Sequence, residues 1–254
     1  MKKFARFNLS GDVFWALVEG NNVFRVIDSI YSQTPEINQK PININKLKIV
    51  APFEGNKVIG LGYNYKGLVG RKSHFDEPLL FLKSPESVVA HNGDVIYPEY
   101  CKKIWIETEL TIIIGKKGKN IPLSQTDEYI LGYTCGNDIT AENIHDRDWH
   151  LAVSKGLDTF APVGPYIIQG IDTNDLEIHS SINGKITQKS RTSDRILNDQ
   201  ECVALVSKYF TLNPGDIIMT GTPAGATDAV VQPGDEVAVE IENIGCLRNY
   251  IIKK

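Results

Sequence analysis

The sequence has few of the features that mark secreted, zinc-binding or membrane proteins. It contains four cysteines in 254 residues, and these lie too far apart to form the close pairs of zinc or redox sites. No apolar run approaches the roughly 18 residues that span a bilayer. The residues after Met1-Lys2-Lys3 are too polar for the apolar part of an export signal. We therefore expect a cytoplasmic protein with reduced thiols and no membrane partner.

An excess of charge of one sign is also missing. Lysine and arginine number 27, aspartate and glutamate number 31, and the formal net charge is -4. This balance provides no basic field for a nucleic acid, so we expect no nucleic-acid partner. The hydrophobic content of 42% is that of an ordinary globular protein, and a chain of this length can bury a full core.

The distribution of β-type residues predicts a small N-terminal unit and one larger domain. Two such runs, 13–18 and 23–27, flank Glu19-Gly20-Asn21-Asn22, which is typical of a hairpin turn. A polar stretch with two prolines then leads to Asn45 and is interpreted as a linker. We predict a small N-terminal β unit with its linker at residues 1–45 and a main domain at residues 46–254.

In the main domain, strand patterns outnumber helical ones. Strands are predicted at 57–61, 79–83, 104–114, 217–220, 236–241 and near Ile251. The clearest helix is 199–210, capped by Asn198 or Asp199, and weaker helical patterns cover 124–130 and 141–151. Because strands and helices do not alternate regularly, we predict an α+β fold of packed mixed sheets with few helices.

Two acidic side chains lie on one face of the predicted strand 104–114. Side chains alternate along a strand, so Glu107 and Glu109 project from the face opposite to Leu110. Two neighbouring carboxylates repel each other unless water or a cation lies between them. A Glu-x-Glu pair alone belongs more often to a solvated strand face than to a metal site, and both interpretations stay open at this point.

A third acid, Asp138, follows an apolar run, 129–136, that we expect to be buried. Three carboxylates are hard oxygen donors, which suit Mg²⁺, Mn²⁺ or Ca²⁺ better than zinc and leave positions open for water or substrate. Three carboxylates and one dication leave a single negative charge, so an anionic substrate needs another cation nearby. Lys155 is the candidate, although a solvated lysine is the commoner case.

Several short motifs resemble the fumarylacetoacetate hydrolase family in their order and spacing. They are Gly62-Tyr63-Asn64-Tyr65, Pro78-Leu79-Leu80-Phe81-Leu82-Lys83, Glu107-Thr108-Glu109-Leu110, Asn137-Asp138, the run from Lys155 to Pro165, Asn183-Gly184 with Gln188, the run from Leu212 to Pro223, and Pro233-Gly234-Asp235. Each motif is short, but together they extend from about Val58 to Ile251, which argues against a chance match.

The resemblance implies a β-rich sandwich roll of the α+β class, usually found as a homodimer. It implies that Glu107, Glu109 and Asp138 hold Mg²⁺ or Mn²⁺, with Ca²⁺ a further option in crystals, and that Lys155 lies at a small-molecule substrate. From the matched motifs, Tyr65, Gly221 and Thr222 are the expected substrate contacts. The loop 220–225 offers amides and hydroxyls that could hold a carboxylate, and a plain turn between two strands is the alternative.

The sequence departs from the family pattern in its proton-transfer residues. Many members carry a His-x-x-Glu dyad, and Leu68 and Arg71 occupy those positions here. His74 and Glu77 repeat the spacing further on, although a surface loop is the simpler interpretation. His145 falls in an expected lid segment and is a candidate proton carrier.

Without the dyad, water-activated hydrolysis is less favoured than enolisation, which needs a metal, a cation and a proton acceptor. We therefore expect a metal-dependent isomerase or tautomerase of 2-oxo or 2-hydroxydienoic carboxylic acids, and the resemblance implies a role in aromatic catabolism. A C–C bond hydrolase or decarboxylase, acting on acylpyruvate or oxaloacetate, is the first alternative. A catalytically idle protein that binds a metal and a ligand is the second.

Overall fold

The computed structural model describes residues 1–71, 77–143 and 148–253, and strands dominate this part of the chain. The strands are β1 Lys2–Leu9, β2 Asp12–Glu19, β3 Asn22–Arg25, β4 Ile42–Asn43, β5 Lys48–Val50, β6 Val58–Gly62, β7 Leu79–Lys83, β8 Val88–Val89, β9 Asp94–Tyr97, β10 Ile104–Trp105, β11 Thr108–Ile114, β12 Ile130–Asn137, β13 Thr140–Ala141, β14 Ala161–Gln169, β15 Glu177–Ile182, β16 Lys185–Arg191, β17 Ile217–Met219, β18 Glu236–Ile241 and β19 Gly245–Lys253. The α-helices are α1 Ala152–Gly156 and α2 Asp199–Tyr209, and short 3-10 helices include η2 Lys66–Arg71 and η4 Leu123–Tyr129. The predicted β-rich α+β class is confirmed.

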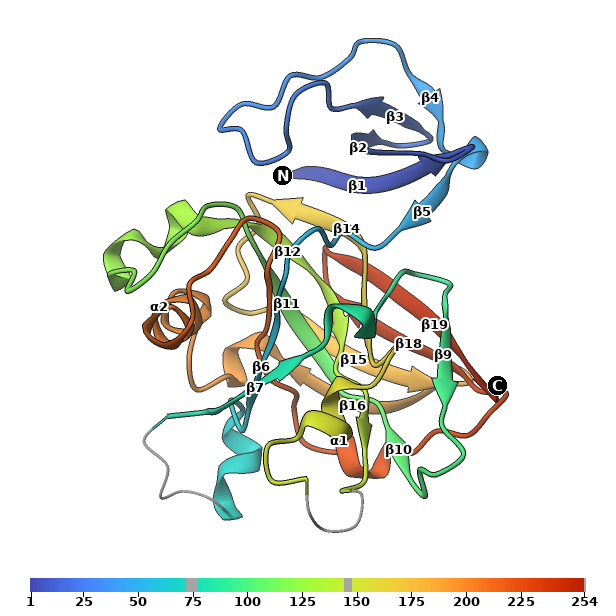
Figure 1. Cartoon of the computed structure of the whole chain (residues 1–254), viewed down its shortest axis with the longest axis vertical. Coiled ribbons are helices and arrows are strands. Elements are labelled where there is room, and N and C mark those ends of the chain that lie inside the picture. Colours follow the sequence, from blue (N-terminus) through green and yellow to red (C-terminus); the bar gives the residue numbers. More distant parts are fainter. Residues whose placement is uncertain (72–76, 144–147, 254) are drawn as a thin grey trace.

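Within the described residues the strands form two large sheets and a separate two-stranded ladder (Figure 1). The larger sheet has twelve strands and the main order β4-β3-β2-β1-β14-β12-β11-β17-β6-β7. The second sheet has the order β16-β15-β18-β19-β9, and β10 pairs with β13. The sheets share a core in which Leu110 and Ile112 of β11 cluster with Val239 of β18. The faces of β11 therefore lie in packed protein rather than in solvent.

Helix α2 packs at the side of this core and begins as the sequence predicts (Figure 1). The Asn198 side chain accepts a hydrogen bond from the Glu201 amide, and the Glu201 carboxylate accepts one from the Asn198 amide. This reciprocal capping box satisfies two of the amides that a helix start leaves without partners. Val203 and Val206 turn inward to the core. The predicted helix and its cap are confirmed.

Two other predictions need correction. The predicted strand 104–114 is divided into β10 and β11, because the chain changes partners from β13 to β12 and β17. The predicted helix 141–151 is wrong in its described part, where Thr140–Ala141 form β13 and α1 begins only at Ala152. The Glu142 amide donates to the Lys103 carbonyl, which extends the pairing beyond β13 and commits this backbone to an extended form. The weaker pattern at 124–130 forms the 3-10 helix η4.

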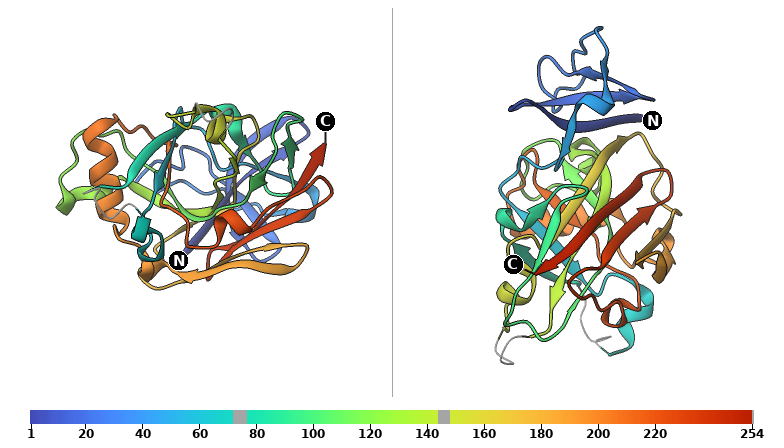
Figure 2. Two further views of the ribbon diagram at one scale, coloured as in Figure 1. Left: turned by 90° about the horizontal axis from the view of Figure 1, so that it is seen from below. Right: turned by 90° about the vertical axis from the view of Figure 1, so that its right-hand side faces the viewer.

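The N-terminal strands form a layer at one end of the molecule, where they extend the larger sheet (Figures 1 and 2). β2 and β3 form the predicted hairpin, and β1 pairs with both β2 and β14. Phe7 belongs to a local core, whereas Phe4 clusters with Val163 of β14. The division into units 1–45 and 46–254 stays a prediction.

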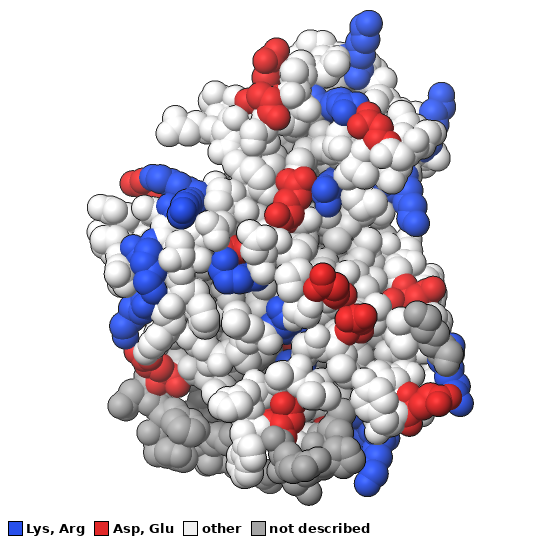
Figure 3. Space-filling view, in the orientation of Figure 1, with Lys and Arg blue, Asp and Glu red and all other residues white. Residues whose placement is uncertain are grey.

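The surface carries both signs of charge. Blue and red side chains are interspersed over the face shown in Figure 3. No helix in the described ranges is long and apolar enough to cross a membrane. The four cysteines are free thiols, and Cys101, Cys135 and Cys202 are buried.

Candidate metal centre

Three acidic side chains meet where β11 begins and β12 ends. Glu109 lies in β11, Glu107 lies in the gap between β10 and β11, and Asp138 directly follows β12. These strands are antiparallel neighbours, and the Asp138 amide donates to the Glu107 carbonyl at 3.0 Å. One carboxylate oxygen of each residue lies within 4.8 Å of the other two. The exposed fractions of Glu107, Glu109 and Asp138 are 9%, 1% and 0%, so the carboxylates do not form a solvated strand face.

Two buried lysines contact this acidic group. Lys155 of α1 has its Nζ 2.6 Å from Asp138 Oδ2 and 3.0 Å from Glu107 Oε2. Lys83, the last residue of β7, pairs with Asp138 Oδ1 and donates to the Ile139 carbonyl at 3.1 Å. Lys155 is therefore held at the carboxylates and is not a solvated lysine. Sequence reasoning missed Lys83 as a site residue, although its position two residues after the buried Phe81 puts both on one face of β7.

The charges of this group shift one another's pKa values. Burial and then the charges of Asp138 and Glu107 raise the pKa of Glu109 well above its ordinary value. Burial acts in the same direction on Asp138, but Lys155 and Lys83 outweigh it and lower the pKa of that carboxyl. Burial would lower the pKa of Lys155, but the carboxylates outweigh it and raise that pKa. Full burial lowers the pKa of Lys83.

The donor set fits a hard dication. Three carboxylates and two charged lysines have a formal sum of -1, so a dication would bring the sum to +1. A site of that charge attracts an anionic ligand, which the carboxylates alone would repel. Burial and the charges of Asp138 and Glu107 raise the pKa of Glu109, and a bound dication would offset that repulsion. Oxygen donors of this kind are typical of Mg²⁺ and Mn²⁺ sites.

Glu107 and Glu109 also accept hydrogen bonds from the surrounding protein. Glu107 Oε1 lies 2.8 Å from both the Trp105 indole nitrogen and the Thr140 hydroxyl. Glu109 Oε2 accepts from the Gly221 amide at 2.7 Å. Trp105 and Thr140 are further site residues that were not predicted from the sequence. Trp105 lies two residues before Glu107, so strand alternation could have indicated it, whereas the contact of Thr140 depends on the pairing of β10 with β13.

The loop after β17 brings Gly221 to the acidic group and holds Thr222 next to it in the chain. Gly221 has φ +100°, and a Cβ there would lie 2.9 Å from the Asn64 Cβ, so glycine is required by both backbone and space. Thr222 Oγ1 accepts a hydrogen bond from Gln188 Nε2 at 2.9 Å. Gln188 Oε1 in turn accepts from the Thr108 amide at 3.1 Å, which ties the loop to β11. The loop is therefore tied to Glu109 and to β11, and its role as a substrate contact stays a prediction.

Tyr65 is buried, and its hydroxyl has no hydrogen-bond partner among the described residues. Burial raises the pKa of this hydroxyl, and the charge of Glu109 adds to the increase. The hydroxyl therefore keeps its proton at neutral pH. A buried polar group without a partner is costly, and a ligand atom could satisfy it.

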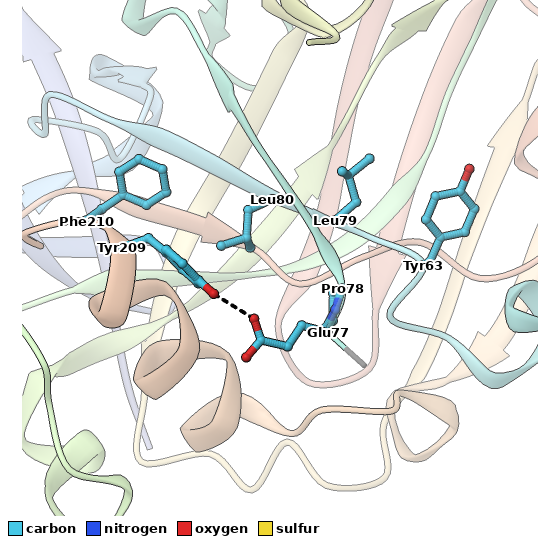
Figure 4. A pocket seen from close by; sticks show the side chains of 7 residues that line it. All are labelled: Tyr63, Glu77, Pro78, Leu79, Leu80, Tyr209 and Phe210. Carbon is cyan, nitrogen blue, oxygen red and sulfur yellow. Dashed lines mark hydrogen bonds between the residues drawn. The ribbon is translucent and has the colours of Figure 1, made fainter. Parts of the chain in front are cut away.

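Of the residues predicted to transfer protons, the structure describes only Glu77. His145 and His74 lie outside the described residues. Glu77 hydrogen-bonds to Lys208 Nζ at 2.9 Å and to the Tyr209 hydroxyl at 2.8 Å, so its carboxylate faces α2 (Figure 4). Glu77 lines a cavity of about 420 Å³ between β7 and α2, and none of the three clustered acids lines this cavity.

Comparisons with known proteins match this chain to one family. Residues 57–252 match the model of the fumarylacetoacetate (FAA) hydrolase C-terminal family. A fumarylacetoacetate hydrolase domain-containing protein 2 homolog of Dictyostelium discoideum is 37% identical over 241 residues, covering 85% of this chain and 77% of the relative.

Two solved structures are also similar over the whole chain. A 2-hydroxyhepta-2,4-diene-1,7-dioate isomerase from Mycobacterium marinum superposes with a TM-score of 0.91 at 32% identity, covering 100% of this chain and 99% of that one. A fumarylacetoacetate hydrolase from Exiguobacterium antarcticum gives 0.89 at 27% identity, covering 100% of both chains. Relatives of this fold therefore include both an isomerase and a hydrolase.

Proposed function

Since the chain belongs to the fumarylacetoacetate hydrolase family, we propose that it is a divalent-metal-dependent enzyme of 2-oxo or enolic carboxylic acids, with isomerisation or tautomerisation as its reaction. The observation that carries the proposal is the buried convergence of Glu107, Glu109 and Asp138 with Lys155. A bound dication, Mg²⁺ or Mn²⁺, would supply Lewis-acid stabilisation of the negative charge that develops on an enolate.

The protein's own groups have distinct roles in this proposal. Lys155 places a permanent positive charge beside two of the three carboxylates, where it balances charge that develops on the substrate. Thr222 Oγ1 accepts from Gln188, which leaves the threonine's hydrogen to donate to a substrate carboxylate. The Tyr65 hydroxyl offers a second neutral donor. The limited exposure of these groups keeps bulk water away from the reacting carbon.

We propose His145 as the proton acceptor. We expect His145→Ala to slow proton exchange by roughly 100-fold or more, as the loss of a general base does. Unchanged turnover in this variant would remove His145 from the mechanism.

The second candidate reaction is hydrolytic C–C bond cleavage. It is favoured by the similarity to the hydrolase of Exiguobacterium antarcticum. Product analysis with acylpyruvates and oxaloacetate separates cleavage and decarboxylation from isomerisation. A metal- and ligand-binding protein without activity is the third possibility, and it predicts no chemistry with any of these acids.

We also propose that the protein is cytoplasmic and forms a homodimer. Size-exclusion chromatography with light scattering would test the homodimer.

The test of the function is deuterium exchange at C3 of 2-oxo acids, followed by NMR. We expect exchange that stops with a chelator and returns with Mg²⁺ or Mn²⁺. Glu107→Gln and Asp138→Asn should lose both metal binding and exchange, whereas Lys155→Met should retain metal binding and lose exchange by roughly 100-fold or more. Tight Mg²⁺ binding by the Glu107 and Asp138 variants would refute the proposed centre.

A further inference from the structure

The ladder formed by β10 and β13 directs two donors at one oxygen of Glu107. Trp105 and Thr140 are directly opposite each other in this ladder. The Trp105 indole N–H donates to Glu107 Oε1 at 2.8 Å, and Thr140 Oγ1 lies 2.8 Å from the same oxygen. Thr140 Oγ1 also lies 3.0 Å from the Asp138 carbonyl, but a hydroxyl has one hydrogen, and the carboxylate is the nearer and stronger acceptor.

The position of this carboxylate is fixed from the backbone as well. The Glu107 amide donates to Asn137 Oδ1 at 3.1 Å, and the Ile106 amide donates to the Ala229 carbonyl at 3.1 Å. Glu107 Oε2 is the oxygen that faces the group, since it lies 3.0 Å from Lys155 Nζ. Turning the carboxylate so that both oxygens face inward would break two hydrogen bonds in a site that is largely closed to water.

The other two acids are also bonded to the protein. Glu109 Oε2 accepts from the Gly221 amide, and both oxygens of Asp138 are paired with lysines, Oδ1 with Lys83 and Oδ2 with Lys155. At least one oxygen of each carboxylate is thus held by a protein donor. Mg²⁺ and Mn²⁺ accept six ligands in a regular octahedron, whereas the larger Ca²⁺ takes six to eight and often binds both oxygens of a carboxylate.

We propose that Trp105 and Thr140 are positioning residues that restrict Glu107 to ligation through a single oxygen and thereby favour a small octahedral cation over Ca²⁺. The inference rests on the proposed function, because it requires that the centre binds a dication. In this proposal, the short β10–β13 ladder selects the metal.

The test is calorimetric titration of the chelator-treated protein with Mg²⁺, Mn²⁺ and Ca²⁺. Thr140→Val keeps the side-chain volume and removes the donor, and Trp105→Phe keeps an aromatic ring and removes the indole N–H. We expect each to weaken Mg²⁺ binding by roughly 10-fold, the lower end for loss of a hydrogen bond to a ligand. Ca²⁺ binding should change little, so the ratio of Mg²⁺ to Ca²⁺ affinity falls by a similar factor.

Two controls separate positioning from general damage. Thr140→Ser keeps the hydroxyl and should restore the affinity ratio of the parent protein. Trp15→Phe removes a comparable indole-to-carboxylate bond, from Trp15 Nε1 to Glu54 Oε2 at 2.8 Å in the N-terminal layer, and should leave the ratio unchanged.

The outcomes are distinct. If the parent protein binds none of the three cations, the proposed function fails. If it binds them and Thr140→Val and Trp105→Phe keep its affinity ratio, the positioning role is overturned while the function stands. Should Trp105→Phe fail to fold, the comparison of Thr140→Val with Thr140→Ser decides the question.

Discussion

Asp138 is the most strongly paired carboxylate of the centre, since each of its oxygens contacts a different buried lysine. Lys83 contacts Oδ1 and Lys155 contacts Oδ2. The two lysines differ in their other partners, because Lys155 also reaches Glu107, whereas Lys83 donates to the Ile139 carbonyl. We infer that Lys83 holds Asp138 in place and that Lys155 is the lysine available to a substrate.

Removal of Lys83 should therefore destabilise the fold. In Lys83→Met the buried Asp138 loses one of its two cations, and breaking a buried pair in this way costs about 3 kcal/mol or more. We expect a fall of that size in the free energy of unfolding, measured by urea denaturation with chelator present. Added Mg²⁺ should recover part of the loss, because it supplies positive charge to the same carboxylate.

Lys116→Met is the matched control for this measurement. Lys116 pairs with Glu128 at 3.0 Å, but both side chains are more than half exposed. Water screens this pair, so we expect little change in stability. Equal effects in the two lysine variants would contradict the structural role of Lys83.

At the scale of elements, the loop after β17 links the strand ends to the acidic group. The Gly221 amide contacts Glu109, while the Thr220 carbonyl accepts from Asn64 Nδ2 at 2.8 Å. Asn64 also accepts from the Leu197 amide at 2.8 Å, so one buried side chain joins this loop to the segment before α2. The Gly-Tyr-Asn-Tyr motif thus supports the centre through the backbone of its neighbours.

Gly221→Ala should disturb this arrangement in two ways. The new Cβ would lie 2.9 Å from the Asn64 Cβ and 3.1 Å from the Leu61 carbonyl oxygen, and alanine is strained at φ +100°. We expect lower stability together with at least a roughly 10-fold loss of Mg²⁺ affinity, since the bond to Glu109 is displaced.

Gly234→Ala controls for backbone strain alone. Gly234 has φ +101°, and nothing lies within 4 Å of the position that its Cβ would take. This variant should lose some stability and keep its Mg²⁺ affinity, both of which thermal unfolding and calorimetry would measure. Equal loss of affinity in the two variants would argue against the contact with Glu109.

The sequence allowed the individual strands and the acidic residues to be predicted better than their surroundings. Alternation along 104–114 and the cap at Asn198 depend on nearby residues, so they are visible in the chain itself. The contact of Lys83 with Asp138 joins residues 55 positions apart, and that of Thr140 with Glu107 joins residues 33 positions apart through the pairing of β10 with β13. Neither follows from local periodicity. The helix predicted at 141–151 is wrong in its described part for the same reason, because pairing with β10 overrode a weak local pattern at its start.

In the molecule as a whole, the N-terminal strands and the strands that carry the centre belong to the same twelve-stranded sheet. β14 pairs with β1 on one side and with β12 on the other, and Asp138 follows β12 directly. Phe4 of β1 is 1% exposed and clusters with Val163 of β14. Loss of packing in the N-terminal layer should therefore also destabilise the strands around the acidic group.

Phe4→Ala tests this continuity. Truncation of a fully buried phenylalanine typically costs about 3–5 kcal/mol, and because Phe4 packs on β14 we expect the whole chain to unfold in one transition at a lower temperature. Leu9→Ala is the control, since Leu9 is 38% exposed at the end of β1 and should have a small effect. Scanning calorimetry distinguishes the outcomes: a separate early transition in Phe4→Ala, with the main transition unmoved, would show that the N-terminal layer unfolds independently. A single shifted transition would mean that the stability of the metal centre depends on a layer that contributes none of its ligands.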